Sequence, residues 1–343
     1  MRKGTCVLVL LAALLGVSVG SVTSASAQAQ VFKWKLQTVD DASLMEYKLL
    51  AVKFADRVRE LSNGRLDIKV FPAGGLSPSY EVFDAVKKGL IDMSQHYLVY
   101  WAGKDPGLYA CCEWAAMRDP LQGMVWYYHA GGLDIMRKIL AKHGLHYLGA
   151  SPIGGEHIWS KKPIRGVADL KGMKVRAAGA AGDMFSILGA SVVSVPGGEV
   201  YQALERGVVD AAEFTFPTVN YALGFHEVTK YIILPTYSGG GTYDWFVNAK
   251  AWEALPDDLK KIVEVALNET TLLYWLKNIA ETEVVMEKLR KHGMTFIQWP
   301  PEEMAKLEAA RVAAMEKFAA KSPEFATKLK SQMELLRLLG YGR

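Results

Sequence analysis

Cysteine is scarce in this sequence, with three residues among 343: Cys6, Cys111 and Cys112. Cys6 precedes the first apolar run, so it does not stand where a lipid-attachment cysteine would. Cys111 and Cys112 are neighbours, and a disulfide between adjacent cysteines is strained. No His or further Cys lies near them at metal-ligand spacing, so we expect small buried side chains. A strained vicinal disulfide and an unpaired reactive thiol are the alternatives.

Several motifs of enzymes and nucleic-acid-binding proteins are also missing. The 7 histidines are scattered and form no His-Glu-x-x-His motif, which argues against a zinc site. After residue 27 there is no Gly-x-Ser-x-Gly nucleophile elbow and no phosphate-binding loop. The net charge is only +4, without a Lys/Arg block that could neutralise phosphates. We therefore expect no nucleic-acid partner and no serine or zinc hydrolase.

The N-terminus has the pattern of a secretory signal peptide over residues 1–27. Arg2 and Lys3 precede the apolar run Val7–Val19, and small residues follow through Ala25-Ser26-Ala27. The run is shorter than the roughly 20 residues of a membrane span, although a retained anchor is the alternative. We expect a mature chain outside the cytoplasm, in the periplasm.

The segment Glu199–Glu213 is a near-copy of Glu81–Gln95, with five of fifteen positions identical and six more conservative. Each copy predicts a short amphipathic helix ended by Gly89 or Gly207 and followed by a buried strand. We expect the strands to begin at Leu90-Ile91 and at Val208-Val209. The copies are 118 residues apart, too far for a solenoid period, which favours two similar lobes with a cleft between them.

The remaining pattern is that of an α/β protein, and the length suggests two domains. Strands are predicted at Val31–Thr38 and Arg65–Phe71, and helices at Ser43–Ser62 and Met124–Gly144. Residues 257–292 contain no Pro or Gly and predict one helix about 54 Å long, which would run along both lobes. The expected division is residues 31–152 and 242–281 for lobe I, residues 153–241 and 282–310 for lobe II, and residues 311–343 for C-terminal helices.

Polar residues at the predicted strand ends are the candidates for chemistry. Arg176 ends a strand and is followed by small residues, so its guanidinium could bind a carboxylate; a structural ion pair is the alternative. Glu213 and Asp244 could share a hard cation or form an acid/base pair, or they could simply be solvated. The two repeat strands would deliver Gln95-His96 and Glu213-Phe214 to the cleft.

Aromatic residues lie at junctions between elements, where they could wall a small-ligand cleft or belong to the core. They are Tyr97, Tyr100, Trp101, Trp159, Tyr237 and Trp245.

The chain after residue 27 resembles the solute-binding subunit of tripartite ATP-independent periplasmic (TRAP) transporters, the DctP-like family. The segments that carry the resemblance are Phe71–Leu76, Tyr100–Pro106, Leu170–Arg176 and Val208–Glu213. The Tyr-Trp-Ala-Gly-Lys-Asp-Pro run is similar to the branch that binds 2-oxo and 2-hydroxy monocarboxylates. The resemblance implies a two-lobed periplasmic-binding-protein fold of type II, with a long helix spanning both lobes and further C-terminal helices.

The resemblance also assigns roles to residues. Arg176 would pair with the ligand carboxylate, and Glu213 with the carbonyl of Phe214 would hold a Na⁺ or Ca²⁺ ion that bridges to the ligand. Asp244 would be a further acidic ligand of that ion. The branch places a glutamine ligand near residue 156, and here Glu156 and His157 are the possible substitutes. Phe214 stands where the branch usually has Trp.

We therefore expect a binding protein for a small organic carboxylate, with Tyr100, Trp101 and Tyr237 among the residues around the ligand. No catalytic cofactor is expected, and the partners would be TRAP membrane subunits and a second copy of the chain. The alternatives are a secreted hydrolase that uses Glu213, Asp244 and Glu156, and a ligand-sensing protein for a receptor.

Overall fold

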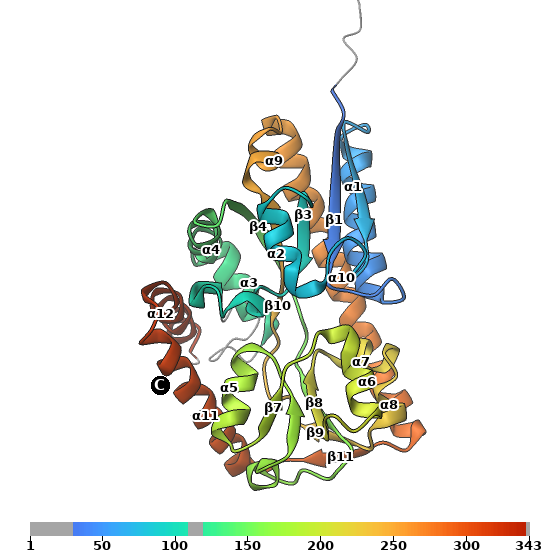
Figure 1. Cartoon of the computed structure of the whole chain (residues 1–343), viewed down its shortest axis with the longest axis vertical. Coiled ribbons are helices and arrows are strands. Elements are labelled where there is room, and N and C mark those ends of the chain that lie inside the picture. Colours follow the sequence, from blue (N-terminus) through green and yellow to red (C-terminus); the bar gives the residue numbers. More distant parts are fainter. Residues whose placement is uncertain (1–29, 109–118, 341–343) are drawn as a thin grey trace, which may run out of the picture. The chain divides into compact units, whose positions relative to one another are not determined.

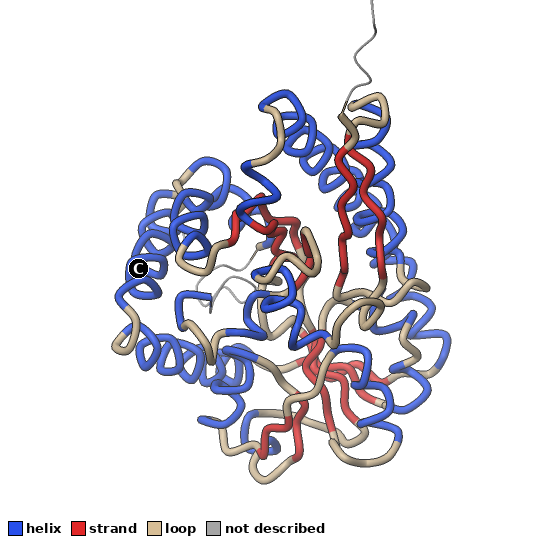
Figure 2. The backbone as a smooth tube through the Cα atoms, turned by 45° about the horizontal axis from the view of Figure 1, so that its top comes forward, coloured by secondary structure: helices blue, strands red, loops and turns tan. Residues whose placement is uncertain are grey.

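The computed structural model describes residues 30–108 and 119–340, and the predictions for the signal peptide and for Cys111 and Cys112 lie outside them. Residues Val31–Arg343 form one compact unit. None of the described helices is both long and apolar enough to cross a membrane. The unit contains two mixed sheets covered by helices, which confirms the predicted α/β class. Figure 2 shows the strands of the two sheets as separate groups.

The first sheet is built from the N-terminal part of the chain and one returning strand (Figure 1). Its strands, in spatial order, are β2 (Leu66–Phe71), β1 (Phe32–Thr38), β3 (Met93–His96), β10 (Thr242–Asn248) and β4 (Leu145–Pro152). β1 pairs in parallel with β2 and β3, whereas β10 is antiparallel to β3 and β4. All seven residues of β10 are buried, as expected for a strand in the interior of a covered sheet.

The second sheet has six strands and lies in the lower part of Figure 1. Its strands, in spatial order, are β11 (Thr295–Gln298), β9 (Tyr231–Leu234), β5 (His157–Ser160), β8 (Ala211–Phe214), β6 (Lys174–Arg176) and β7 (Ser191–Val193). β8 is parallel to β6 and antiparallel to β5. The end of β8 and the end of β6 therefore meet the beginning of β5 at one edge of the sheet, and this edge carries the site described below.

Each of the two repeats forms the predicted unit of helix, glycine and strand, but both strands begin later in the chain than predicted. Helices α2 (Val82–Lys87) and α6 (Val200–Glu205) end before Gly89 and Gly207, which have φ values of 73° and 70°. This left-handed conformation favours glycine. The predicted strand starts are wrong, since β3 and β8 begin at Met93 and Ala211. The first apolar residue of each pair is exposed, Leu90 by 62% and Val208 by 48%, because both belong to the turn.

The long helix α10 (Asp257–His292) has the predicted bounds. It packs against α1 (Lys53–Leu61) and β4 of the first sheet and against α7 (Pro217–Ala222) of the second sheet's side. It ends at Gly293, whose φ of 92° is a left-handed C-cap. These tertiary contacts along both sheets stabilise a helix of 36 residues.

Other helices match the predictions less closely. The predicted helix Ser43–Ser62 is a π-helical turn, Tyr47–Val52, that continues into α1. The prediction of one helix over Met124–Gly144 is wrong, because Gly131 has a φ of 83° and separates α3 (Pro120–His129) from α4 (Gly132–Ala141). The other helices are α5 (Gly179–Ile187), α8 (Phe225–Val228), α9 (Ala249–Glu253), α11 (Pro301–Ala319) and α12 (Pro323–Leu338).

The C-terminal helices return to both sheets. α11 packs on α5 beside the second sheet, and α12 packs on α3 and α4 beside the first. The division predicted between residues 310 and 311 falls inside α11. One continuous helix therefore crosses the predicted boundary between lobe II and the C-terminal helices.

Candidate functional site

A cavity of about 40 Å³ lies where the segment after β3 meets the strand ends of the second sheet. The first sheet's side contributes Tyr97, Val99 and Tyr100, which follow β3 directly. The other lining residues are Ile153, Glu156, Arg176, Ala178, Glu213, Phe214 and Thr215. Charged groups thus converge on a small, partly open cavity, and a few convergent polar groups in a concave site are typical of small-ligand recognition.

Arg176, the last residue of β6, is held from several sides and is only 2% exposed. Its Nε and Nη2 donate to the Val195 carbonyl oxygen at 3.2 and 3.0 Å. Its Nη1 donates to the main-chain oxygen of Glu213 at 2.9 Å and to the Glu213 carboxylate at 3.3 Å. The guanidinium carbon lies 5.0 Å from the centre of the Phe214 ring. Burial acts to lower the pKa of Arg176, but the Glu213 carboxylate together with Tyr100, Tyr80 and Tyr237 outweighs it, so that the pKa is raised.

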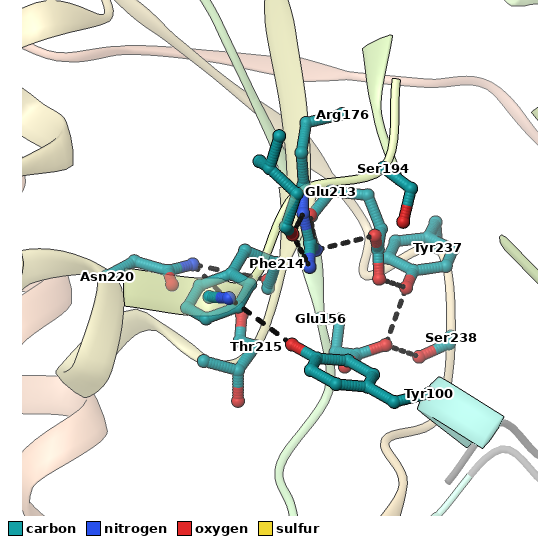
Figure 3. A network of polar contacts seen from close by, with 12 residues as sticks. Tyr100, Glu156, Arg176, Ser194, Glu213, Phe214, Thr215, Asn220, Tyr237 and Ser238 are labelled. Carbon is teal, nitrogen blue, oxygen red and sulfur yellow. Dashed lines mark hydrogen bonds and ion pairs between the residues drawn. The ribbon is translucent and has the colours of Figure 1, made fainter. Parts of the chain in front are cut away.

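Two buried carboxylates meet at one phenol (Figure 3). The Tyr237 hydroxyl lies 2.6 Å from an oxygen of Glu156 and 2.6 Å from an oxygen of Glu213, and Ser238 donates to Glu156 at 2.8 Å. Burial, reinforced by the charge of Glu213, raises the pKa of Glu156 to about 7. Burial also raises the pKa of Glu213, against the opposing effect of Arg176. Both carboxyl groups are therefore harder to ionise in the folded protein than in water, and a bound cation would favour their ionised forms.

These donors fit a hard cation. A phenol has one hydrogen, so two ionised carboxylates around Tyr237 leave one close oxygen–oxygen contact without a hydrogen between the atoms. Thr215 lines the cavity, and its buried hydroxyl has no hydrogen-bond partner among the described residues. Carboxylate, carbonyl and hydroxyl oxygens are the ligands that Na⁺ and Ca²⁺ take. No group of three or more His, Cys, Asp or Glu side chains suited to a metal occurs in residues 30–108 and 119–340, so neutral oxygens would have to complete the set.

Tyr100 connects the segment after β3 to the second sheet's side. Its hydroxyl accepts a hydrogen bond from the backbone N–H of Gly197 at 3.3 Å, and burial raises its pKa to about 12. A Cβ at Gly197 would lie 2.7 Å from the Phe214 ring, so glycine is needed for this close approach. A second contact between the two sides, between the hydroxyls of Tyr80 and Ser194, measures 3.3 Å.

Three predicted site residues lie in the first sheet's interior and not among those that line the cavity. Gln95 is fully buried and donates from Nε2 to Asp40 at 3.1 Å. Burial lowers the pKa of His96 to about 3, and Nδ1 of its ring accepts from the N–H of Tyr97. The Trp101 ring is 2% exposed, and its Nε1 donates to the Tyr80 carbonyl oxygen.

The remaining predicted residues are divided between the two sheets. Tyr237 contacts both carboxylates of the site, as described above. His157 is opposite Phe214 in the β5–β8 ladder, and burial lowers its pKa to about 4. Asp244 lies in β10 of the first sheet, where its carboxylate accepts from Tyr147 at 2.8 Å and from the N–H of Leu98 at 3.1 Å. The structure thus brings Glu213, Phe214 and Glu156 to the cavity, and it holds Asp244 in a separate hydrogen-bond network.

Tyr97, one of the aromatic residues that could wall a cleft, lines the cavity, whereas four other lining residues were not predicted: Val99, Ile153, Ala178 and Thr215. Thr215 follows Glu213-Phe214 at the strand end, and Ala178 follows Arg176 after one residue. Both could have been found by extending each strand-end prediction by two residues. Val99 and Ile153 carry no polar group, and only the three-dimensional arrangement identifies them.

Comparison with known proteins gives one consistent result. The family model described as bacterial extracellular solute-binding protein, family 7 (DctP), matches residues 38–322. The chain is 31% identical over 315 residues to the monocarboxylate 2-oxoacid-binding periplasmic protein of Nostoc sp., covering 91% of this chain and 86% of that protein.

Two solved structures superpose closely, each with a TM-score of 0.84. One is a TRAP transporter solute-binding protein from Bordetella bronchiseptica, 27% identical and covering 91% of this chain and 93% of that one. It is a mixed-occupancy dimer, with copurified calcium and picolinate in one active site and an apo site. The other, from Pseudoalteromonas atlantica, has bound sodium and pyruvate; it is 28% identical, covering 90% of this chain and 95% of that one.

The predicted family resemblance is confirmed by these matches, which extend over nearly the whole described chain and include both sheets. The chain belongs to family 7 of the bacterial extracellular solute-binding proteins, the DctP family of TRAP transporter receptors.

Proposed function

We propose that this protein is a periplasmic receptor that captures a small 2-oxo monocarboxylate in the cavity around Arg176 and delivers it to TRAP membrane subunits. The observation that carries the proposal is a buried guanidinium beside two buried carboxylates in one small cavity. A guanidinium recognises a carboxylate by charge and by hydrogen bonds, and both are strengthened where water is excluded. The ligands of the Nostoc and Pseudoalteromonas relatives, a 2-oxoacid and pyruvate, support this ligand class.

The volume favours the smallest members of the class. About 40 Å³ is enough for a few heavy atoms beyond a single water molecule. A three- or four-carbon acid fits this limit better than a long-chain or aromatic acid, which would require the two sides of the cavity to move apart. Tyr100 and Phe214 would then exclude water from the bound carboxylate.

A cation would be part of the recognition. Glu213, the carbonyl of Phe214 and Glu156 are the proposed ligands, with Glu156 preferred to His157 because it lies in the cavity. Asp244 is left out of the proposed set because its carboxylate is hydrogen-bonded within the first sheet. The ion would supply positive charge between two carboxylates and an anionic ligand, and its role would be in binding, without a catalytic step.

The first test is calorimetry with pyruvate and longer 2-oxo acids in three buffers: chelated and sodium-free, with Na⁺, and with Ca²⁺. We expect the tightest binding for three- and four-carbon acids, and an affinity at least about 30-fold lower after cation removal, since an uncompensated buried charge costs several kcal/mol. The acid should be recovered unchanged, which distinguishes a receptor from a hydrolase. Equal affinity in all three buffers would contradict the cation, and no binding of any 2-oxo acid would contradict the function.

The proposal includes a homodimer formed through α10. Its exposed apolar residues Leu272, Leu273, Leu276 and Ile279 are 50–58% exposed and recur at spacings that place them on one helix face. Beside them lies an apolar groove of about 540 Å³ between α3 and α10, to which Leu121 and Trp275 contribute. Large exposed apolar patches are typical of interaction surfaces.

Light scattering tests this part of the proposal. We expect the wild type to have twice the mass of one chain, and Leu272→Glu combined with Leu276→Glu to be monomeric, because each new carboxylate would be buried unpaired in the interface. Leu338→Glu on α12, where the wild-type side chain is 68% exposed, is the matched control and should stay dimeric. A monomeric wild type at micromolar concentration would rule the dimer out.

A further inference from the structure

The hydrogen bonds of Arg176 leave little of its guanidinium for a ligand. Arginine has five N–H groups. Among the described residues four hydrogen bonds occupy them, two to the Val195 carbonyl oxygen and two to Glu213. One N–H on Nη2 is left, whereas a carboxylate bound in a fork requires two. An acid can therefore bind in a fork only if one of the four existing bonds is given up.

The bond to the Glu213 carboxylate is the one most readily exchanged. At 3.3 Å it is the longest of the four, and unlike the three bonds to main-chain oxygens it ends on a side chain that can rotate. The same carboxylate lies 2.6 Å from the Tyr237 hydroxyl and is a proposed cation ligand. Glu213 thus has two competing uses in one cavity, as a partner of Arg176 and as a ligand for a cation.

From this arrangement we infer that Glu213 acts as an internal competitor of the acid. In the cation-free protein its carboxylate occupies the guanidinium of Arg176, and in the cation-bound protein it turns to the ion and leaves that N–H to the acid. The inference rests on the proposed function and adds to it a physical origin for the coupling between cation and acid. Glu213 is in this respect a positioning residue, because it controls acid binding through Arg176.

The competition has two measurable consequences, and a simple bridging ion would share the first but not the second. By linkage, the factor by which a cation strengthens acid binding equals the factor by which acid strengthens cation binding, and we expect at least about 30-fold for both. More unusually, loss of the cation ligand Glu213 should improve acid binding in the absence of cations. A residue that serves only as a cation ligand would show no such gain.

The test is the affinity for pyruvate, measured by calorimetry in chelated, sodium-free buffer, for the wild type, Glu213→Gln and Glu156→Gln. Glu213→Gln keeps the shape and the hydrogen bond to Tyr237 but cannot form the ion pair. We expect it to bind pyruvate at least about 10-fold more tightly than the cation-free wild type, and to respond less than about 2-fold to Ca²⁺.

Glu156→Gln is the matched control, because it removes a carboxylate of the same cavity. Glu156 accepts from Tyr237 and Ser238, and no hydrogen bond joins it to Arg176 in the described part of the chain. Loss of a negative charge in the cavity should itself strengthen acid binding, but the gain of Glu156→Gln in cation-free buffer should be at least about 3-fold smaller than that of Glu213→Gln, and this difference measures the release of Arg176.

An independent arm measures Ca²⁺ alone, without acid. Arg176→Gln removes the competing partner of Glu213, so Ca²⁺ should bind more tightly than to the wild type by a factor of about 10. If Glu213→Gln binds pyruvate no better than the cation-free wild type, or if Arg176→Gln does not strengthen Ca²⁺ binding, the competition is wrong while the receptor function stands. If the wild type binds no 2-oxo acid in any buffer, the proposed function is wrong and the inference with it.

Discussion

Replacing Arg176 with alanine is expected to raise the dissociation constant for the acid at least about 1000-fold, because it leaves two buried carboxylates and an anionic ligand without a compensating guanidinium. Glu213 and Glu156 are only 4% and 9% exposed, so water cannot replace the lost charge. Added Ca²⁺ should recover part of the affinity and not all of it, since the planar fork that orients the carboxylate is absent. Calorimetry with pyruvate in calcium buffer measures the change.

Two further variants make this result interpretable. Arg165→Ala removes an exposed arginine between β5 and β6 of the second sheet. It should leave the affinity for the acid within about 2-fold of the wild type. Arg176→Lys keeps the charge but not the four hydrogen bonds, and an intermediate loss of about 30-fold to 100-fold is expected. Circular dichroism checks that Arg176→Ala is folded. A folded Arg176→Ala protein that binds within about 10-fold of the wild type would show that the carboxylate is anchored elsewhere.

Much of the fold could be predicted from the sequence because its elements are local. The long helix was predicted with correct bounds, since 36 residues without Pro or Gly leave few alternatives. Gly89 and Gly207 correctly marked the two helix ends in the repeats. The break at Gly131 was missed because its flanks continue an apolar pattern, and a glycine inside such a pattern is not by itself a helix end.

The site could be predicted where it depends on strand ends and not where it depends on the path of a loop. Arg176 and Glu213 end adjacent parallel strands, so their meeting follows from the topology. Gln95 and Glu213 are equivalent in the two repeats, yet Gln95 binds Asp40 in the first sheet's interior and Glu213 lines the cavity. The repeat predicts equal positions in the sheets, and both residues have an antiparallel neighbour, Trp245 opposite Gln95 and Ile158 opposite Glu213. The repeat does not predict which segments, distant in the sequence, reach each side chain.

The position of Asp244 has the same cause. The three glycines Gly239-Gly240-Gly241 are typical of a turn that enters a strand, and β10 begins directly after them at Thr242 and carries Asp244 into the ladder opposite His96. In the chain, β10 follows strands β5 to β9 of the second sheet and then returns to the first sheet. Its place therefore depends on residues far apart in the sequence. Local patterns contain no information about its partner strands.

Asp40 and Glu46 are two buried acidic residues on the first sheet's side that do not line the cavity. We expect them to affect the free energy of unfolding and not ligand binding. Asp40 and Glu46 are 4% and 1% exposed. Burial raises the pKa of Asp40 to about 7, although hydrogen bonds from Gln95 and Tyr243 oppose the shift. Burial, with the charge of Asp40 added, raises the pKa of Glu46 to about 8. In the unfolded chain both groups ionise near pH 4. Between this pH and the raised pKa values, the folded protein therefore binds more protons than the unfolded chain.

The free energy of unfolding should therefore fall as the pH rises through these values. Where the folded state binds more protons than the unfolded state, stability decreases with increasing pH. The stabilising effect of the raised pKa values is complete at low pH and is lost as the pH passes about 7 for Asp40 and about 8 for Glu46. Together with Glu156, we expect a loss of about 3 kcal/mol between about pH 6.5 and about pH 8.5. Urea denaturation of cation-free protein measures it.

Asp40→Asn should remove a large part of this pH dependence and raise the stability at about pH 8.5 by about 2 kcal/mol. The amide keeps an acceptor for Tyr243, and its new donor can serve Gln95, whose buried Oε1 has no partner among the described residues. Asp134→Asn, at an exposed position on α4, is the control and should leave the slope unchanged. A wild type whose stability is constant or rises over this range would mean that Asp40 and Glu46 are ionised in the fold, and that a buried positive charge or bound cation compensates them.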